Sequence, residues 1–405
     1  MEKKKPEIRF NGFEGEWATT TLGECFLERV ERSAEGELIS VTISQGVVRA
    51  SDLDRIDNSS NDKSNYKVVE VGDIAYNSMR MWQGACGYSL YKGICSPAYT
   101  VVIPQNNIDV VYCFYLFKRN ETLQLFRVNS QGLTSDTWNL KYPAFSQIKC
   151  SFPSLSEQEK IGLFLTTLDK LIAKLEAKLD KLRKLKQALL EKMFTNVNRG
   201  GYETPEIRFK GYTDKWQVKE LREILSEPII YGLNAKAITY DGTNKYLRIT
   251  DIDDDTREFR QDNLTSPDIK EPAEVYKLTT NDIVLARTGA TVGKSYLYEA
   301  KVGTTFFAGF LLRARVSEQY DANFVFSTTL TRQYKAFVRE SSQRSSQPGI
   351  NAREFSRYSF SLPCLSEQKQ VGKALKNIGI SIKTIDVKLT KLRNIKQSLL
   401  QKMFA

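Results

Sequence analysis

The residues of this chain that could bind a phosphate are concentrated in the segment ARTGATVGKS, which runs from Ala286 to Ser295. A nucleotide-binding P-loop needs a glycine, four residues and then Gly-Lys-Ser or Gly-Lys-Thr, because a ring of that size surrounds a phosphate with backbone N–H groups. Here only three residues separate Gly289 from Gly293, so the segment is a poor nucleotide site. It is either a plain hairpin turn or a turn whose side chains contact DNA, namely Arg287, Thr288, Thr291 and Lys294.

Other catalytic and metal sites find little support. The sequence has no histidine, which removes Ser-His-Asp and Cys-His nucleophiles and histidine metal ligands. The acidic cluster of Asp251, Asp253, Asp254 and Asp255 could hold a hard cation, but it lacks the glycine and distal glutamate of an EF-hand loop. A solvated turn is the favoured interpretation of that cluster.

The bulk features indicate a folded protein of the cytoplasm. The six cysteines include no CxxC pair, which is typical of reduced thiols rather than of disulfides or a zinc site. No apolar run approaches the roughly 20 residues of a membrane span. The opening MEKKKPEIRF lacks the apolar core of a signal peptide.

The positive charge is unevenly distributed. From Arg80 to Ser151 there are seven basic and three acidic residues, and from Arg287 to Arg357 there are eleven and five. A basic half-domain is the electrostatic footprint expected of a phosphate-binding surface, with a solvated face as the alternative.

The sequence is duplicated. PEIRFNGFEGEW at Pro6–Trp17 returns as PEIRFKGYTDKW at Pro205–Trp216, and FPSLSEQEKIG at Phe152 returns as LPCLSEQKQVG at Leu362. Such self-similarity predicts a repeated architecture of domain, helix, domain, helix. We expect the four segments to be 1–155, 156–196, 197–365 and 366–405.

Each predicted helix carries a heptad seam of apolar residues, which specifies coiled-coil pairing. We expect the two seams to pair antiparallel around a pseudo-two-fold axis, with homodimerisation through either helix as the alternative. Ser156 and Glu159 are expected to form a capping box. The predicted seam residues are Leu168, Ile172, Leu175, Leu179, Leu182 and Leu189 in the first helix, and Ile378, Ile382, Ile385, Leu389, Leu392 and Leu399 in the second.

The two globular segments are expected to be mixed α/β domains. SNYKVVEVGDIAYN and VYKLTTNDIVLAR each predict a strand, a polar turn and a strand, and residues 109–128 and 321–340 each predict a helix. Polar loops follow, at 129–141 and 341–353, whose Gln, Asn and Arg side chains suit base edges. Besides the four residues named above, the candidate DNA contacts are Arg80, Trp82, Gln83, Lys92, Gln131, Thr134, Ser135, Thr137, Asn139, Lys141, Ser342, Gln343, Arg344, Ser345, Gln347, Asn351 and Arg353.

Together LPCLSEQ, LLQKMF, PEIRFKGYTDKW and NDIVLARTGATVGK closely resemble the specificity subunit of type I restriction–modification enzymes, over nearly the whole chain. The resemblance implies two target-recognition domains that each read one half of a split DNA target, with the helices setting the gap. It implies no catalytic activity in this chain and no cofactor of its own. The partners would be two modification subunits that methylate adenine N6 with S-adenosylmethionine, and restriction subunits that use ATP and Mg²⁺.

Two other classes stay open at this point. A coiled-coil adaptor would have no DNA affinity at low salt. An enzyme acting alone, such as an NTPase or nuclease, would turn over ATP or DNA without partners, which the missing histidine and the broken P-loop argue against.

Overall fold

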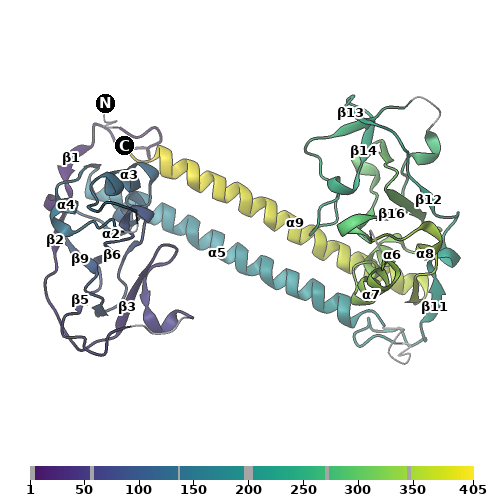
Figure 1. Ribbon diagram of the computed structural model, residues 1–405, viewed down its shortest axis with the longest axis horizontal. Helices are drawn as coiled ribbons and strands as arrows, with labels where there is room; N and C mark the ends of the chain where they lie inside the picture. Colours follow the sequence, from purple (N-terminus) through teal and green to yellow (C-terminus); the bar gives the residue numbers. More distant parts are fainter. Residues whose placement is uncertain (1–4, 55–58, 136, 196–203, 270–272, 344–347) are drawn as a thin grey trace. The chain divides into compact units, whose positions relative to one another are not determined.

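The computed structural model describes residues 5–54, 59–135, 137–195, 204–269, 273–343 and 348–405. The chain forms two compact units, and the division between them cuts both long helices (Figure 1). The first unit holds the residues up to Leu175 together with Lys388–Ala405, and the second holds Glu176–Val387. Each unit therefore contains one globular domain, the start of one long helix and the end of the other.

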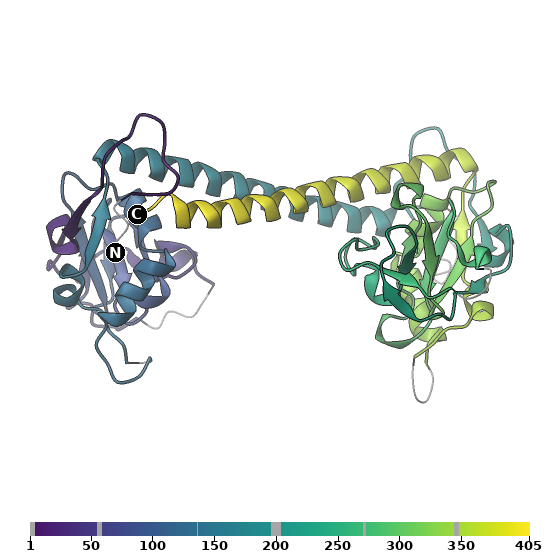
Figure 2. The ribbon, with the colours of Figure 1, turned by 90° about the horizontal axis from the view of Figure 1, so that it is seen from above.

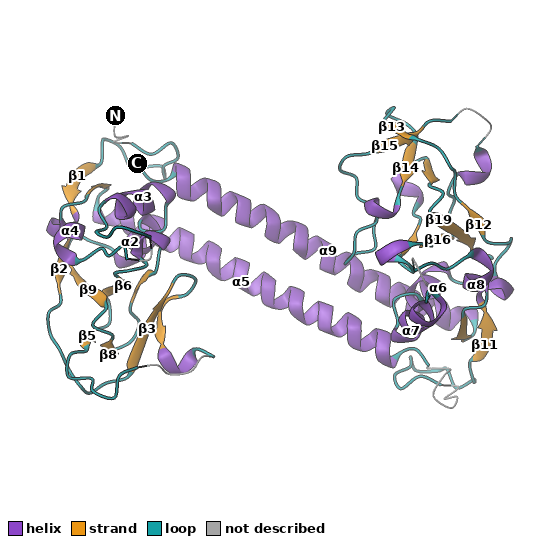
Figure 3. Cartoon of the chain, in the orientation of Figure 1, coloured by secondary structure: helices purple, strands orange, loops and turns teal. Residues whose placement is uncertain are grey.

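The first globular domain mixes short strands with short helices (Figure 3). Its strands are β1 (Ala18–Thr21), β2 (Phe26–Glu28), β3 (Leu38–Thr42), β4 (Gly46–Arg49), β5 (Lys67–Val69), β6 (Ile74–Asn77), β7 (Cys86–Tyr88), β8 (Gly93–Cys95), β9 (Tyr99–Pro104) and β10 (Lys149–Phe152). Its helices are α1 (Leu22–Cys25), α2 (Val110–Leu116), α3 (Asn120–Val128) and α4 (Tyr142–Ser146), with single 3-10 turns η1 (Ala50–Asp52) and η2 (Met81–Gln83).

Among the described residues of this domain, the strands form two larger sheets and a short one. The first sheet has the order β2-β9-β6-β7, with antiparallel neighbours throughout. The second has the order β4-β3-β8-β5 and includes one parallel pair, β3 with β8. Strand β1 pairs with β10, which leads directly into the first long helix.

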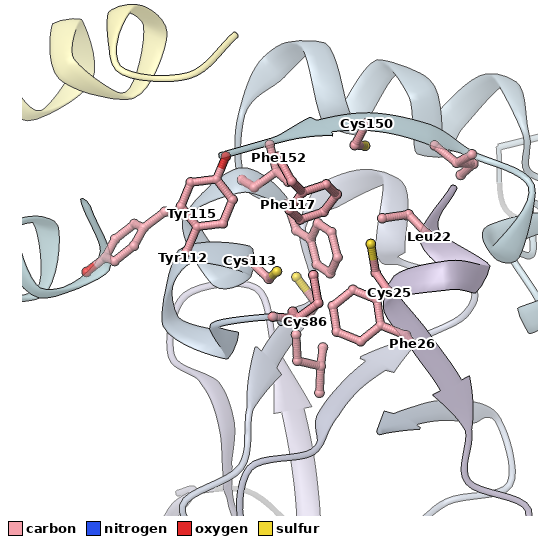
Figure 4. Close-up of a cluster of buried hydrophobic side chains, with 14 of the residues drawn as sticks. Leu22, Cys25, Phe26, Cys86, Tyr112, Cys113, Tyr115, Phe117, Cys150 and Phe152 are labelled. Atoms are coloured by element: carbon pink, nitrogen blue, oxygen red, sulfur yellow. The ribbon is translucent and has the colours of Figure 1, made fainter. Parts of the chain in front are cut away.

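The core of the first domain is aromatic and thiol-rich (Figure 4). Phe26 and Phe117 are fully buried with their ring centroids 5.9 Å apart. Cys25 and Cys86 lie among these rings, and burial raises the pKa of their thiols to about 12 and about 11 respectively. These thiols therefore act as small apolar core residues, because a reactive cysteine needs an accessible thiolate.

The second globular domain repeats the main sheet of the first. Its strands are β11 (Gln217–Glu220), β12 (Ile230–Tyr231), β13 (Ala237–Thr239), β14 (Lys245–Leu247), β15 (Thr265–Pro267), β16 (Asp282–Ala286), β17 (Ser295–Leu297), β18 (Thr305–Phe307), β19 (Leu311–Arg315) and β20 (Ser359–Leu362). Its helices are α6 (Ala322–Thr328), α7 (Arg332–Ser341) and α8 (Ala352–Ser356). Its 3-10 turns are η4 (Leu221–Ile224), η5 (Ile249–Asp251), η6 (Glu274–Tyr276), η7 (Gly289–Thr291) and η8 (Ala300–Val302).

Sheet β12-β19-β16-β17 corresponds strand by strand to β2-β9-β6-β7. Likewise β11 pairs with β20 as β1 pairs with β10. Mixed α/β domains are therefore confirmed in both halves of the chain.

Two of the sequence predictions for these domains need correction. Each predicted helix, 109–128 and 321–340, is two helices, α2 with α3 and α6 with α7. The strand predicted within VYKL is the 3-10 turn η6, because Lys277 retains only an isolated bridge to Phe306 where β5 of the first domain pairs with β8.

The long helices are α5 (Leu155–Lys192) and α9 (Leu365–Lys402), and their segments lie side by side in both views (Figure 1, Figure 2). In the first unit Lys396 Nζ lies 2.5 Å from a carboxylate oxygen of Asp169. In the second unit Arg183 and Asp386 form an ion pair at 3.6 Å. The pairing is antiparallel, and every predicted seam residue is buried or half-buried, which confirms the predicted coiled coil.

The capping box predicted from Ser156 and Glu159 is wrong. Helix α5 begins at Leu155, so both residues lie inside its first turns. The carboxylate of the neighbouring Glu157 instead accepts hydrogen bonds from Arg9.

The repeated PEIRF and LSEQ segments hold each domain onto the helices. In the first unit Arg9 donates two hydrogen bonds to the buried carboxylate of Glu157, at 2.7 and 2.8 Å. In the second unit Arg208 makes the same contact with Glu367, with both bonds at 2.8 Å. Paired hydrogen bonds between a guanidinium and a carboxylate fix orientation as well as distance. The segments that carry the duplication are therefore structural anchors.

The PEIRF segment of each repeat, which we call the arm, also binds the end of the other long helix. The N–H of Ile8 donates to the carbonyl of Lys402 at 2.9 Å, and the N–H of Ile207 donates to the carbonyl of Lys192 at 3.0 Å. These carbonyls are among those that a helix end leaves without an internal partner. Each arm thus connects the start of one long helix to the end of the other within its unit.

The helix ends complete the domain cores. Phe404 is 3% exposed and stacks on Tyr112 of the first domain, with the ring centroids 5.1 Å apart. Phe194 occupies the corresponding place in the second unit, 5.1 Å from Phe324. Each domain core therefore includes a side chain from the helix that began in the other unit.

Candidate nucleic-acid interface

The two polar segments predicted separately in the second domain form one surface. The turn after β16 and the loop before α8 are joined by a bridge between Thr288 and Gly349. The N–H of Gly289 donates to the carbonyl of Pro348 at 3.0 Å, and the N–H of Ile350 donates to the carbonyl of Arg287 at 2.9 Å. We call this surface, residues 287–291 with 348–350, the second-domain tip.

The corresponding segments of the first domain also meet. The N–H of Leu140 donates to the carbonyl of Ser78 at 2.9 Å, which is the counterpart of the bond between Ile350 and Arg287. The rings of Trp82 and Trp138 pack edge to face with centroids 5.1 Å apart. We call this surface, residues 78–83 with 137–140, the first-domain tip.

Arg287 is held on the second-domain tip by two aromatic rings. Its guanidinium carbon lies 5.1 Å from the centroid of Tyr231 and 6.0 Å from that of Phe310. Both rings are accessible, with exposed fractions of 44% and 62%. Its Nε donates to the carbonyl of Gly309 at 3.2 Å. The result is an oriented guanidinium beside exposed aromatic surface.

The first-domain tip carries an arginine of different origin. Arg127 at the end of α3 lies over the ring of Trp138, 5.0 Å from its centroid. The Arg127 side chain is exposed. Each tip thus combines a cation with aromatic rings, a combination that binds bases by stacking and by donation to base edges.

Sequence reasoning missed four members of these clusters: Arg127, Trp138, Tyr231 and Phe310. Arg127 was assigned to a structural helix, and Tyr231 and Phe310 lie far from Arg287 along the chain. The available signal was that Trp138 stands between two predicted contacts, Thr137 and Asn139.

Lys294 does not belong to the accessible surface of the second-domain tip. It is 7% exposed, and its Nζ lies 2.5 Å from Asp254 and donates to the carbonyl of Ile252 at 3.0 Å. This placement argues against the predicted DNA contact, because Lys294 is buried and its ammonium group is already paired with Asp254 and with the carbonyl of Ile252 inside the domain.

The acidic cluster that Lys294 binds is a hydrogen-bonded turn. Asp253 accepts hydrogen bonds from the N–H groups of Asp255 and Thr256, at 3.1 and 2.9 Å. Hydrogen bonding led by the Thr256 N–H lowers the pKa of Asp253 to about 2. Within the described part of the chain, no cluster of carboxylate and thiol side chains is arranged to hold a metal ion. The solvated turn is the better interpretation of these residues.

The other predicted contacts are dispersed. Lys92 pairs with Glu70 at 2.8 Å, near the start of β6 and away from the tip at its far end. Asn351 caps α8 by accepting from the N–H of Glu354 at 2.9 Å, and Ser342 is buried. Arg344, Ser345 and Gln347 lie outside the described residues. Trp82, Gln83, Asn139, Thr288 and Thr291 are half-buried, and Arg80, Gln131, Thr134, Ser135, Thr137, Lys141, Gln343 and Arg353 are exposed.

A sequence model for the type I restriction modification DNA specificity domain matches residues 16–184 and again residues 213–394. The chain belongs to this family. The two matches follow the duplication, one to each repeat, and together they cover most of the chain. The resemblance to type I specificity subunits is confirmed.

Two curated proteins that the chain resembles come from Methanocaldococcus jannaschii. The type I restriction enzyme MjaVIII specificity subunit is 26% identical over 165 residues, which cover 39% of this chain and 36% of the relative. The putative MjaX specificity subunit is 22% identical over 191 residues, 44% of this chain and 43% of the relative. The matched regions therefore span less than half the length of either relative.

A solved structure shares the fold. The crystal structure of the type I restriction–modification system S subunit from M. genitalium is 15% identical, covers 99% of both chains and has a TM-score of 0.63. Along the described ranges of the present chain, no helix is both long and apolar enough to span a bilayer.

Proposed function

We propose that this specificity protein reads a two-part DNA target, with each globular domain contacting one half. The observation that carries the proposal is the pair of tips, which occupy corresponding places on one duplicated scaffold but differ in chemistry. A tryptophan pair with Arg127 stands on one, and Arg287 with Tyr231 and Phe310 stands on the other. Shared backbone with different side chains suits two different half-targets.

The basic character of these half-domains supports the same proposal. There are seven cations against three anions between Arg80 and Ser151, and eleven against five between Arg287 and Arg357. They include the exposed Arg80 of the first-domain tip, the adjacent exposed Lys141, and the exposed Arg353 in α8 of the second domain. Phosphate contacts fix register and supply salt-dependent affinity, while base contacts specify sequence.

We further propose that the paired helices set the spacing of the target halves and bind the modification subunits. Each helix has 38 residues, which corresponds to about 57 Å at the usual rise. Their outer faces expose apolar side chains that the coiled-coil seam does not use, including Leu163 at 69% and Val387 at 61%. These side chains are available to a partner protein, and the proposal that they bind the modification subunits rests on their exposure together with the family membership. S-adenosylmethionine, ATP and Mg²⁺ are then assigned to partner subunits.

The test is to reconstitute the chain with its modification subunits and S-adenosylmethionine, and then to map methylated adenines across a sequence-diverse DNA library. We expect methylation at one interrupted target sequence, with salt-dependent binding in a shift assay. Methylation without sequence preference, or DNA affinity that is absent at low salt, would identify the chain as an adaptor.

Replacing Arg127 with Gln should alter only the half-target read by the first domain. Loss of a base contact weakens binding by about 1–3 kcal/mol. The matched control is Arg49→Gln, since Arg49 also lies over an aromatic ring, 4.7 Å from the centroid of Tyr91, but belongs to β4 rather than to the tip. Equal effects of the two substitutions would remove Arg127 from the interface.

A further inference from the structure

We propose that Arg287 is a specificity-determining residue that reads a guanine in the major groove, and that Tyr231 and Phe310 position it for that contact. This inference rests on the proposed DNA reading by the second domain. It names the residue that reads the base, the base that is read, and the two aromatic rings that orient the side chain.

The backbone of Arg287 is fixed on both sides. Its N–H donates to the carbonyl of Phe310 at 3.1 Å, and its carbonyl accepts from the N–H of Ile350 at 2.9 Å. The residue is thereby held between the turn before β19 and the loop before α8. Because its backbone is fixed on both sides, the Arg287 side chain has few conformations in which it lies away from the tip.

The aromatic rings then restrict the side chain itself. Cation–π and stacking contacts with Tyr231 and Phe310 orient the plane of the guanidinium. Phe310 keeps 62% of its surface exposed, so core packing does not explain its position. The bond from Nε to the carbonyl of Gly309 fixes the remaining rotation.

This arrangement leaves the two terminal nitrogens of Arg287 for a ligand. Among the described residues, none accepts a hydrogen bond from either terminal nitrogen and no carboxylate lies within ion-pair distance of the guanidinium. Neighbouring arginines differ: Arg315 makes two bonds to Asp282, at 2.7 and 3.0 Å, and Arg248 makes two to Asp251, at 2.9 and 2.8 Å. Arg287 is thus oriented without being neutralised.

An oriented pair of N–H donors matches the O6 and N7 acceptors that guanine presents in the major groove, the commonest specific arginine contact. A phosphate can also accept from both terminal nitrogens of a guanidinium, so the substitutions below are chosen to separate the two ligands. The counterpart of Arg287 in the first domain is Ser78, a buried residue whose hydroxyl lies 2.8 Å from that of Thr100. The scaffold therefore does not need an arginine here, which is expected of a residue that serves one half-target alone.

The experiment compares methylation targets of the reconstituted complex carrying wild-type chain, Arg287→Ala, Arg287→Gln or Arg287→Lys. The wild type should require guanine at one position of one half-target. Both Arg287→Ala and Arg287→Lys should reduce that preference by roughly 5- to 150-fold, because lysine keeps the charge and loses the two-pronged donor. All other positions should keep their preferences.

Two positioning variants and one control complete the design. Tyr231→Leu and Phe310→Leu should each relax the guanine preference at the same position by a smaller factor than Arg287→Ala does. Adding Arg287→Lys to either variant should not restore that preference. Arg222→Gln is the control, since Arg222 is an arginine of the same domain with a 64% exposed side chain paired to Glu220. It should leave the target unchanged.

The outcomes separate the inference from the function on which it rests. A wild-type complex without any sequence preference refutes the proposed function. A wild-type complex with a two-part target that Arg287→Ala and Arg287→Lys leave unaltered refutes the inference. Uniform weakening across all sequences, with Arg287→Lys close to wild type, identifies a phosphate contact and also refutes it. Circular dichroism and melting curves identify any variant that fails to fold. The Arg287 variants that do fold then decide whether the guanine contact exists.

Discussion

At the scale of single residues, Arg287 and Lys294 flank the same turn but have opposite surroundings. Both are cations in one short segment, and sequence reasoning assigned both to DNA. The fold turns Lys294 inward to Asp254 and presents Arg287 beside two exposed rings. Because the acidic partner of Lys294 comes from a separate loop, local spacing carries no information about its burial.

The thiols provide a residue-scale prediction. Five cysteines are buried and only Cys364 is exposed. Burial raises the pKa of Cys25 and Cys95 to about 12, so at pH 8 they stay protonated as well as inaccessible. We expect a thiol reagent such as DTNB to label one cysteine per native chain at pH 8.

Labelling in denaturant should reach all six cysteines. The variant Cys364→Ser is the control and should leave the native chain unlabelled. Rapid labelling of several thiols in the native protein would contradict the described core.

At the scale of elements, the sequence predicted the long helices well because their signal is local and repeated. A seam sustained over many turns needs no knowledge of the rest of the chain to be recognised. The errors lie in short elements and at element ends, where competing short-range patterns are nearly equal in strength. Ser156 and Glu159 match a capping box, yet the helix begins at Leu155, and the N–H groups of Glu157 and Gln158 both donate to the carbonyl of Ser154.

The anchors formed by the arms give an element-scale prediction. Glu367 is fully buried and its carboxylate is held by Arg208. Replacing Arg208 with Met leaves a buried charge without its partner, which typically costs about 3–5 kcal/mol of folding free energy. We expect chemical denaturation of the variant to show a loss of about 3 kcal/mol, concentrated in the second unit.

Two further variants make this test specific. In the double variant Arg208→Met, Glu367→Met much of the loss should be recovered, since apolar replacement of a buried ion pair is often neutral. Arg222→Met breaks an exposed pair and should change stability by about 0.5 kcal/mol or less. A single variant as stable as wild type would show that the arm is not an anchor.

The tips were predictable only in part. Their polar loops stand out in the sequence, and the structure joins the two predicted loops in each domain by backbone bonds such as those at Ser78 and Arg287. The aromatic rings beside Arg287 come from β12 and from the turn before β19, and only the sheet order brings them to that residue. Pairing between distant strands is the kind of information that periodicity does not contain.

At the scale of the whole molecule, the core of each unit is completed by the end of the long helix that began in the other unit. This arrangement predicts matched effects for two substitutions at equivalent helix ends. Phe404→Ala removes a buried ring from the first unit, and Phe194→Ala removes its counterpart from the second. Phe404 is buried, and truncation of a buried phenylalanine typically costs about 3–5 kcal/mol, whereas Phe194 is half-buried and its truncation should cost less.

Hydrogen exchange resolved by segment is the measurement for this pair. Phe404→Ala should accelerate exchange in α2 of the first domain, around Tyr112, and Phe194→Ala should accelerate it in α6 of the second, around Phe324. Each variant is the control for the other. If Phe404→Ala instead loosened the second unit, the described assignment of α9 would be incorrect.

Phe404 is synthesised long after the first domain whose core it completes, and this delay affects the order in which the protein folds. Arg119 of the first domain bonds the carbonyl of Ala405, a contact across 286 positions of the chain. Domains emerging from a ribosome usually fold in the order of synthesis. Here the first domain has its own sheets early, but its core is closed only after the entire second unit has been translated. We therefore expect the nascent first domain to keep an open aromatic surface around Tyr112 until the end of α9 has been synthesised, and both units to consolidate only after that point.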